Sequence, residues 1–300
     1  MSNQPSTPLN SGNVVFNRFH ILSHLGQGGM GHVYQVRDTV SNSIYALKTL
    51  VPEEGKNVKA IARFQKEFSA MKELDHPNIV RAFEFYQQGE ELLGFTMEFV
   101  KGSDLDTLIY KNNISLKIEE KIGLLEQIAE GLSYAHDHDI VHRDLKPANI
   151  LIEKSADNNL ISKITDFGLA QQESDGADMS QSSNRIGTAY YMSPEQHRGE
   201  ELNSRTDIYS FGILAFELLT AKRPFDGNTP FKLFLAHVSQ GIPDIRKINS
   251  DIPKWLANMV EICSEKKPEH RYRTMKEVLS LIRSKKDRKE ASRNIFSIFK

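Results

Sequence analysis

The sequence has one cysteine, no long apolar run and no excess of charge of either sign. The single cysteine, Cys263, rules out an internal disulfide framework and suits a reducing compartment, so we expect a cytoplasmic protein. Lysine and arginine number 38 against 39 acidic residues, a balance that gives no overall electrostatic reason to expect nucleic-acid binding. The longest apolar run, residues 211–219, is interrupted by Glu217 and is far shorter than the roughly 20 residues of a membrane helix. No secretory signal is expected, because the sequence opens with polar and turn-forming residues.

What the chain does contain is enough apolar material for real cores. Its 300 residues are 39% hydrophobic, which suits one large domain or two small ones. Residues 1–15 are expected to form a disordered leader, and residues 284–300 a basic and apolar tail. Between them the pattern changes near residue 100, from short β-rich segments to long helical ones. The sequence therefore predicts an α+β chain with a small β-rich part followed by a larger helical part.

Individual elements can be read from the spacing of apolar residues. Strands are expected at 32–38, 44–50, 79–87 and 91–100, and one amphipathic helix is expected at 58–74. In the second part the clearest helices are 121–138 and 207–220. The latter is apolar on nearly every face, which predicts a buried central helix with Asp207 as its cap.

Four glycines fall within six positions of the segment LGQGGMGHVY, residues 25–34. A Walker A loop is excluded, because His32 and Val33 follow where lysine and serine or threonine must stand. A dinucleotide fingerprint needs a helix directly after the loop, and the sequence predicts a strand there. Two interpretations stay open: a glycine flap whose bare backbone closes over nucleotide phosphates, and a plain glycine-rich hairpin turn.

Motifs further along the chain favour the flap. Lys48 lies on a predicted strand and Glu67 lies in a predicted helix, so their side chains can converge. The segment HRDLKPANI, residues 142–150, is followed by ITDFG and then by GTAYYMSPEQ, residues 187–196. In this order, and over roughly residues 19–283, the motifs resemble the catalytic domain of protein kinases. The residues of the first and last motifs, LGQGGMGHVY and GTAYYMSPEQ, resemble those of the eukaryotic-like (Hanks-type) serine/threonine kinases of bacteria.

The resemblance implies a bilobal protein-kinase-like fold and transfer of the ATP γ-phosphate to protein serine or threonine hydroxyls. The partners it implies are ATP and protein substrates, without nucleic acid. The small lobe would span about residues 16–97, with one key helix, followed by a hinge at 98–101 and a larger helical lobe at 102–283.

Roles for individual residues also follow from the resemblance. Lys48 would bind the α- and β-phosphates of ATP, and Glu67 would hold its ammonium group; the alternative is an ordinary surface ion pair. Asp144 would accept the proton of the attacking hydroxyl, and Lys146 would contact the γ-phosphate. These four residues form the predicted catalytic set.

Two oxygen-bearing side chains complete the expected chemistry. Asn149 and Asp166 would ligate Mg²⁺, with Mn²⁺ as an alternative ion. The competing interpretation treats Asp144 and Asp166 as solvated loop carboxylates. That interpretation does not explain the flanking His142 and Phe167, which resemble packing residues of the family.

Binding of the nucleotide would involve residues spread over the chain. By resemblance Met97 gates the adenine pocket, Glu98 and Val100 bind the base through their backbone, and Ala46 and Leu151 enclose it; the alternative is plain core packing. The full expected set is Leu25, Gly26, Gln27, Gly28, Gly29, Met30, Gly31, Val33, Ala46, Lys48, Met97, Glu98, Val100 and Leu151. Glu195 and Arg271 resemble a buried ion pair with a structural role.

Two other classes of protein were weighed. An inactive kinase-like interaction protein would lack the strand lysine, the catalytic aspartate or the aspartate of DFG, and Lys48, Asp144 and Asp166 are all present. A nucleotide-binding oxidoreductase is disfavoured because no helix is predicted directly after the glycine loop.

Regulation is expected in the segment between Asp166 and Glu195. Phosphorylation within Ser180, Ser182 and Ser183 would pair with Arg143, whereas Thr188 would hold the catalytic residues in register. The competing interpretation is that acidic residues of the same segment already supply the charge. In the tail, the basic and then apolar composition fits a weak membrane-surface or docking segment, or a helix extension folding onto the domain.

Overall fold

The computed structural model resolves into two compact units, Met1–Lys101 and Gly102–Lys300. It describes residues 9–27, 31–50, 57–89, 92–111, 116–167, 187–227 and 229–298, the last twelve of these by their backbone alone. The expected α+β class is confirmed, because strands dominate the first unit and helices dominate the second.

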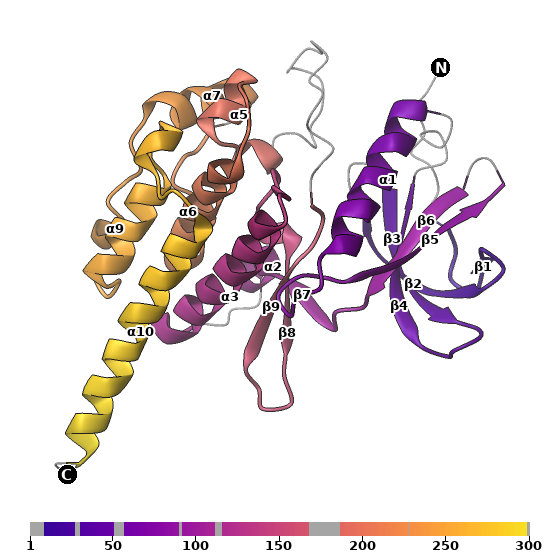
Figure 1. Ribbon diagram of the computed structural model, residues 1–300, viewed down its shortest axis with the longest axis horizontal. Coiled ribbons are helices and arrows are strands. Elements are labelled where there is room, and N and C mark those ends of the chain that lie inside the picture. The colour runs from indigo at the N-terminus through magenta and orange to yellow at the C-terminus, as the bar shows by residue number, and fades with distance from the viewer. Residues whose placement is uncertain are drawn as a thin grey trace. The chain divides into compact units, whose positions relative to one another are not determined.

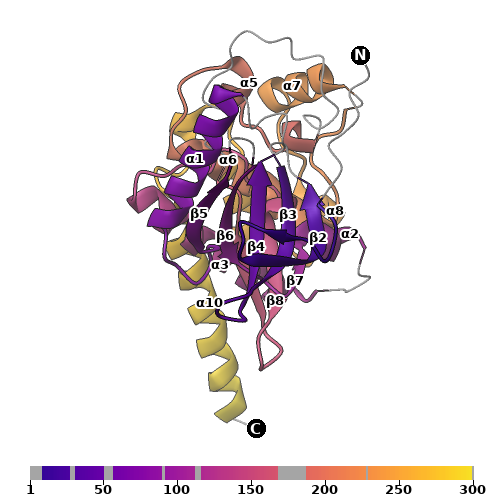
Figure 2. The ribbon, with the colours of Figure 1, turned by 90° about the vertical axis from the view of Figure 1, so that its right-hand side faces the viewer.

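The described part of the first unit is built on an antiparallel sheet with the strand order β1-β2-β3-β4-β6-β5 (Figure 2). Its strands are β1 Val14–Val15, β2 Phe19–Gln27, β3 Gly31–Asp38, β4 Ile44–Leu50, β5 Ala82–Gln88 and β6 Leu92–Glu98. The helix α1, Val58–Glu73, begins after Asn57, whose side chain accepts hydrogen bonds from the Lys59 and Ala60 amides. It lies beside the sheet in both ribbon views (Figure 1).

The start of the chain differs from the expected disordered leader. Val14 and Val15 form β1 and pair with β2, and Val15 is buried with Phe19 in the core of the sheet. The Gly12 amide donates a hydrogen bond to the Ile21 carbonyl. The buried side chain of Val15 and the backbone hydrogen bonds hold this segment on the sheet, although its composition is polar and turn-rich and most of it is exposed.

The second unit combines a small sheet, ordered β7-β8-β9, with helices. The strands are β7 Gly102–Asp104, β8 Ile150–Lys154 and β9 Leu160–Ile164. The α-helices are α2 Leu105–Tyr110, α3 Ile118–Asp137, α5 Pro194–Arg198, α6 Ser204–Thr220, α7 Pro230–Ser239, α8 Ile245–Ile248, α9 Lys254–Cys263 and α10 Met275–Ile298. The 3₁₀ turns within the described part of this unit are η2 Pro147–Asn149 and η4 Pro268–His270.

Helix α6 is the buried centre of the second unit, as its apolar pattern predicts, but it is not capped by Asp207. The helix begins at Ser204, and the side chain of Asn203 accepts the hydrogen bond of the Arg205 amide. Asp207 lies inside the first turn and is completely buried. Asn203 already caps the helix, so the carboxylate of Asp207 is not needed there. Because a buried carboxylate needs hydrogen-bond donors, it must bind another part of the chain.

Helix α10 continues through the segment that was expected to be a separate tail. It packs against α3, where Arg283 pairs with Glu126 and Glu130 and Lys286 pairs with Glu126. Both ribbon views draw it as one continuous rod (Figures 1 and 2). Among the described residues, no helix is both long enough and apolar enough to cross a membrane.

Candidate functional site

The glycine segment joins β2 to β3. Leu25, Gly26 and Gln27 end β2, and Gly31 begins β3; Gly28, Gly29 and Met30 lie outside the described residues. A Cβ atom on Gly31 would stand 1.7 Å from the Thr49 carbonyl oxygen of β4, so only glycine allows this approach of the two strands. A strand follows the loop, which excludes a pyrophosphate site at a helix N-terminus.

Lys48 and Glu67 meet inside the first unit. The Lys48 Nζ of β4 donates to the Glu67 Oε1 of α1 over 2.6 Å, and each side chain is only 7% exposed. Glu67 is polar but lies on the buried side of α1 with Phe64 and Met71. A pair this deeply buried is not an ordinary surface ion pair.

The residues expected around the base belong to β4 and the end of β6. Ala46 pairs in register with Met97, and both are almost fully buried. Glu98 ends β6 and Val100 follows it, both half-buried. This burial fits a nucleotide pocket and a plain core equally well.

In the second unit the segment 142–149 gathers its polar side chains around Asp144. The Asp144 Oδ2 accepts hydrogen bonds from Lys146 Nζ at 2.8 Å and from Asn149 Nδ2 at 3.2 Å. Lys146 Nζ also donates to the Thr188 hydroxyl at 3.0 Å, so Thr188 joins the cluster across 42 positions of sequence. The Asp144 Oδ1 is buried and has no hydrogen-bond partner within the described residues.

The backbone of this loop is held by Asp207, a contact the sequence did not reveal. Its carboxylate accepts the amides of His142 and Arg143, each at 2.8 Å, and a 2.7 Å hydrogen bond from His136. Burial alone would raise the pKa of Asp207, but the hydrogen bonds and the nearby histidine charge outweigh it and hold the pKa below its usual range. Arg143 has φ of 64°, a left-handed conformation that these bonds help to stabilise.

His142 connects the loop to the DFG segment. Its Nδ1 accepts the Asp144 amide at 3.2 Å, so its proton lies on Nε2, which donates to the Thr165 carbonyl at 3.0 Å. Its ring packs against Phe167 with centroids 4.7 Å apart. The two residues therefore link the loop around Asp144 to the segment that contains Asp166.

Asn149 comes directly before β8, and Asp166 comes two residues after β9, at the same end of the β8–β9 hairpin. Ile150 pairs with Ile164, and the Thr165 amide donates to the Asn149 carbonyl at 3.0 Å, so the two segments continue side by side up to Asp166. Asp166 has φ of 58°, and Leu151 on β8 is half-buried. The hairpin brings the two expected metal ligands to one end of the same small sheet.

Glu195 and Arg271 form a buried, bidentate pair. The two guanidinium nitrogens reach the two carboxylate oxygens over 2.7 and 2.8 Å. Burial opposes ionisation of Glu195, but Arg271 outweighs it, so the pKa of Glu195 is lowered. The pair links α5 to the loop after α9.

A second hydrogen-bond network, around Glu217, was not predicted from the sequence. The buried carboxylate of Glu217 on α6 accepts hydrogen bonds from the Tyr191 and Tyr110 hydroxyls, the former at 2.5 Å, and from Arg223. Burial and the neighbouring carboxylate raise the pKa of Tyr191, which keeps its hydroxyl a donor. The sequence feature that could have indicated this network is a charged residue inside the apolar helix 204–220.

The predicted phosphorylation sites Ser180, Ser182 and Ser183 lie outside the described residues.

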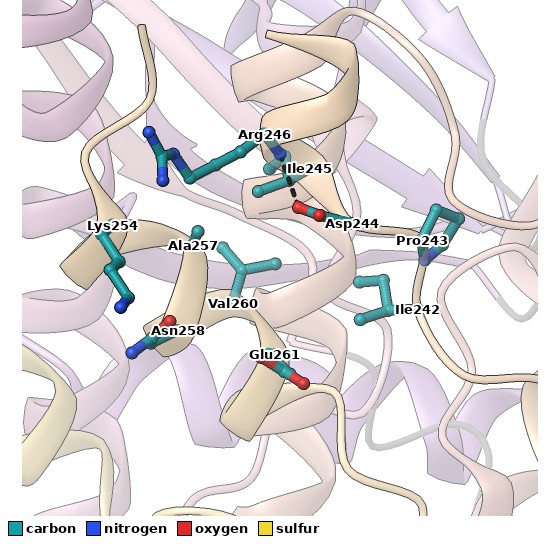
Figure 3. Close-up of a pocket in the computed structure, with 10 residues that line it drawn as sticks. All are labelled: Ile242, Pro243, Asp244, Ile245, Arg246, Lys254, Ala257, Asn258, Val260 and Glu261. Atoms are coloured by element: carbon teal, nitrogen blue, oxygen red, sulfur yellow. Dashed lines mark hydrogen bonds between the residues drawn. The ribbon is translucent and has the colours of Figure 1, made fainter. Parts of the chain in front are cut away.

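A hollow of about 370 Å³ lies elsewhere in the second unit, between α8 and α9 (Figure 3). Its charged lining includes Asp244 and Arg246 on one side and Lys254 and Glu261 on the other. Asp244 is engaged as a cap, because its side chain accepts the Arg246 amide. None of the residues expected to act in catalysis lines this hollow.

Comparison with known proteins shows which family this chain resembles. A family model described as "Protein kinase domain" matches residues 19–281. The chain is 37% identical over 270 residues to a probable serine/threonine-protein kinase PknB of Lactococcus lactis, covering 90% of this chain and 42% of the relative. It is 33% identical over 287 residues to the serine/threonine-protein kinase PrkC of Bacillus subtilis, covering 96% of this chain and 43% of that protein. The chain thus spans about two fifths of the length of these curated relatives.

The fold has a solved counterpart. The crystal structure of the Mycobacterium tuberculosis PknI kinase domain superposes with a TM-score of 0.70 at 24% identity, covering 92% of this chain and 99% of that chain. At this identity the likeness speaks for the fold alone.

Proposed function

The chain belongs to the protein kinase family, and on that premise we propose that it is an active Hanks-type serine/threonine kinase domain. It transfers the γ-phosphate of ATP to serine or threonine hydroxyls of protein substrates and works in the cytoplasm. The catalytic domain comprises a small lobe, a hinge at residues 98–101 and a helical lobe ending near residue 283.

The observation that carries this proposal is the surroundings of Asp144. One carboxylate oxygen is oriented by Lys146 and Asn149, and the other is buried with no hydrogen-bond partner within the described residues. A buried acceptor left unsatisfied costs about 1–3 kcal/mol, so its persistence suits a group that accepts a proton from a substrate hydroxyl. Lys146 holds the carboxylate in place and supplies positive charge beside the transferred phosphate, and the Thr188 hydroxyl holds Lys146.

The metal that the family requires fits the side chains present. Asn149 uses its Nδ2 for both hydrogen bonds to Asp144, so its Oδ1 remains available as a hard oxygen ligand. Together with the Asp166 carboxylate it forms the kind of donor set that suits Mg²⁺, or Mn²⁺, better than softer metals. When bound, the ion neutralises phosphate charge during transfer.

Lys48 and Glu67 are assigned to phosphate binding. The 2.6 Å bond holds the ammonium group at the end of a buried side chain, which limits its freedom before the nucleotide arrives. The glycine segment from Leu25 to Val33 covers the phosphates, and Ala46, Met97 and Leu151 enclose the base.

A transfer assay tests the function. The purified chain is incubated with Mg²⁺, labelled ATP and myelin basic protein, and label in serine and threonine is measured. We expect transfer by the natural chain and by the control Asp157→Ala, which alters an exposed turn of the β8–β9 hairpin. Lys48→Met and Asp166→Ala should abolish it.

Nucleotide binding without transfer by the natural chain would instead identify an inactive kinase-like protein. Substantial transfer by Asp166→Ala would contradict the metal assignment.

Regulation by phosphorylation is a second part of the proposal. The Nε and Nη1 atoms of Arg143 are buried without hydrogen-bond partners within the described residues, and burial lowers its pKa. A phosphoserine at Ser180, Ser182 or Ser183 would bring about two negative charges and three acceptor oxygens to such a group. Mass spectrometry of chains with and without active Asp144 tests autophosphorylation. Full activity of the triple alanine variant, with no phosphate between residues 174 and 188, would refute it.

The end of α10 is proposed as a weak docking or membrane-surface segment. Residues 283–300 carry seven lysines and arginines against two acidic residues, and two isoleucines and two phenylalanines lie near their end. Sedimentation with anionic vesicles tests this, and equal binding after deletion of residues 290–300 would contradict it.

A further inference from the structure

Strand β2 carries two irregularities just before the glycine segment. The register with β3 shifts between Ile21 and Ser23 and again between His24 and Gly26, so β2 has one extra residue at each place. Side chains alternate along a strand, and Ile21 faces the core. The first shift exchanges the faces, which brings His24 opposite Tyr34 on the core side of β3.

His24 then bonds diagonally across the hairpin. Its Nε2 lies 3.1 Å from the Nδ1 of His32, one residue after Gly31, and the tautomers of the two rings decide which nitrogen donates. His32 is only 4% exposed, and its neighbour Val33 points to the opposite face of the strand. The bond therefore spans the second irregularity and ties the two strands at the base of the glycine segment.

Residues near the start of the chain form hydrogen bonds with the same irregular part of β2 and with Tyr34 beside it. The Ser11 hydroxyl donates to the carbonyl of Leu22, the extra residue of the first irregularity, at 2.9 Å. The Leu9 amide donates to the hydroxyl of Tyr34 at 3.0 Å, and the Tyr34 ring lies 5.3 Å from that of His24 between centroids. Residues 9–13 thus satisfy a polar group that the irregular strand would otherwise leave unpaired.

We infer that the His24–His32 bond is a positioning element of the nucleotide-binding glycine segment, set by the irregularities of β2 and supported by the chain's first described residues. The inference rests on the proposed function, since it assumes that this segment binds nucleotide. His24 and His32 do not contact the nucleotide in this scheme. They fix the end of β2 relative to the start of β3, so the glycine segment has less conformational freedom to lose when nucleotide binds.

Substitutions that keep or remove the bond test the inference. His24→Ala and His32→Ala lose it, whereas His24→Gln and His32→Asn place an amide nitrogen or oxygen near the lost ring nitrogen. We expect the alanine variants to raise the Kd for Mg-ADP and the KM for ATP about two- to tenfold, as one hydrogen bond allows. The kcat should change little, and the amide variants should recover most of the loss. His20→Ala, on the same strand before both irregularities, is the matched control.

A second measurement does not depend on catalysis. Amide hydrogen exchange of the nucleotide-free chain should accelerate at residues 31–34 in the alanine variants, while β5 and β6 keep their protection. If the natural chain binds no nucleotide, the proposed function fails. The amide hydrogen exchange measurement would then still show whether the His24–His32 bond orders residues 31–34. Unchanged exchange and nucleotide affinity, or loss of protection throughout the sheet, would overturn the positioning role.

Discussion

Two ion pairs of the second unit have the same kind of chemistry and opposite surroundings. Glu195 and Arg271 are almost fully buried, with exposed fractions of 4% and 0%, whereas Asp144 and Lys146 are exposed by 20% and 22%. Glu195 Oε1 receives Arg271 and the Thr206 hydroxyl, and Oε2 receives Arg271 again. Arg271 also donates to three backbone carbonyls. In contrast, one oxygen of Asp144 has no partner within the described residues.

This difference in hydrogen bonding distinguishes a pair suited to a structural role from a pair suited to a chemical one. A pair whose donors and acceptors are all satisfied has nothing left to offer a substrate, and its removal leaves buried charge behind. A partly exposed carboxylate with one unsatisfied oxygen contributes less to folding but retains an acceptor for a proton. The number of unsatisfied atoms, more than the presence of the ion pair, distinguishes the proposed reactive site from the structural pair.

The largest effect should follow from Asp144→Asn. The amide keeps the size of the side chain but cannot accept a proton, so kcat should fall by about 10²–10⁴-fold. Affinity for Mg-ATP should persist, because the change removes no phosphate ligand, and the free energy of unfolding should move by less than about 1 kcal/mol. Transfer kinetics, nucleotide binding and urea denaturation measure the three quantities.

Asp157→Asn makes the same chemical change at an exposed hairpin turn and should leave all three quantities unaltered. A collapse of nucleotide binding in Asp144→Asn would tell against a role confined to proton transfer.

The buried pair should show the reverse pattern. Glu195→Gln removes one charge and leaves the guanidinium of Arg271 buried and unpaired, which should lower the free energy of unfolding by about 3–5 kcal/mol. A double change, Glu195→Leu with Arg271→Met, should recover part of that loss because no unpaired charge remains. Denaturation in urea at pH 7 measures both. Equal stability of Glu195→Gln and the natural chain would show that the pair is not structural.

Helices and strands could be predicted from this sequence, because they depend on the spacing of apolar residues. The meeting of side chains on neighbouring elements could be predicted with them. The helix at 58–74 and the strand around Lys48 were both readable, and so was the opportunity for Lys48 to meet Glu67. The central helix was recognised from its apolar faces. Motif order then indicated the family, and with it the fold.

Features that depend on contacts between distant segments could not be predicted. Asp207 looks like a helix cap in sequence, but it binds the backbone amides of His142 and Arg143, which lie more than 60 positions away. The irregularities of β2 depend on its register with β3, which alternation alone cannot give. Residues 9–15 resemble a leader by composition and are ordered because the sheet offers them partners.

The smallest effect concerns a third pair, in which neither partner is a permanent charge. His197 and His237 lie with ring centroids 5.3 Å apart, and each has a buried Nε2 without a hydrogen-bond partner within the described residues. Burial lowers the pKa of His197 to about 4, and burial with His197 and Lys266 nearby lowers that of His237 to about 3. Both are therefore neutral in the folded chain near pH 7, as are unfolded histidines above their ordinary pKa of about 6.5.

As the pH falls below about 6.5 the unfolded chain takes up protons that the folded chain does not, so the free energy of unfolding decreases. At pH 5.5 each histidine should have lost about 1 kcal/mol of its contribution, and the loss continues until the pH reaches the folded pKa values. His197→Gln should therefore lose less stability between pH 7 and pH 5.5 than the natural chain in urea denaturation. Ser239→Ala on the exposed side of α7 carries no titratable group and should keep the natural pH dependence. An identical pH dependence for His197→Gln would mean that His197 is protonated in the folded chain as readily as in the unfolded one, against the burial that the structure gives it.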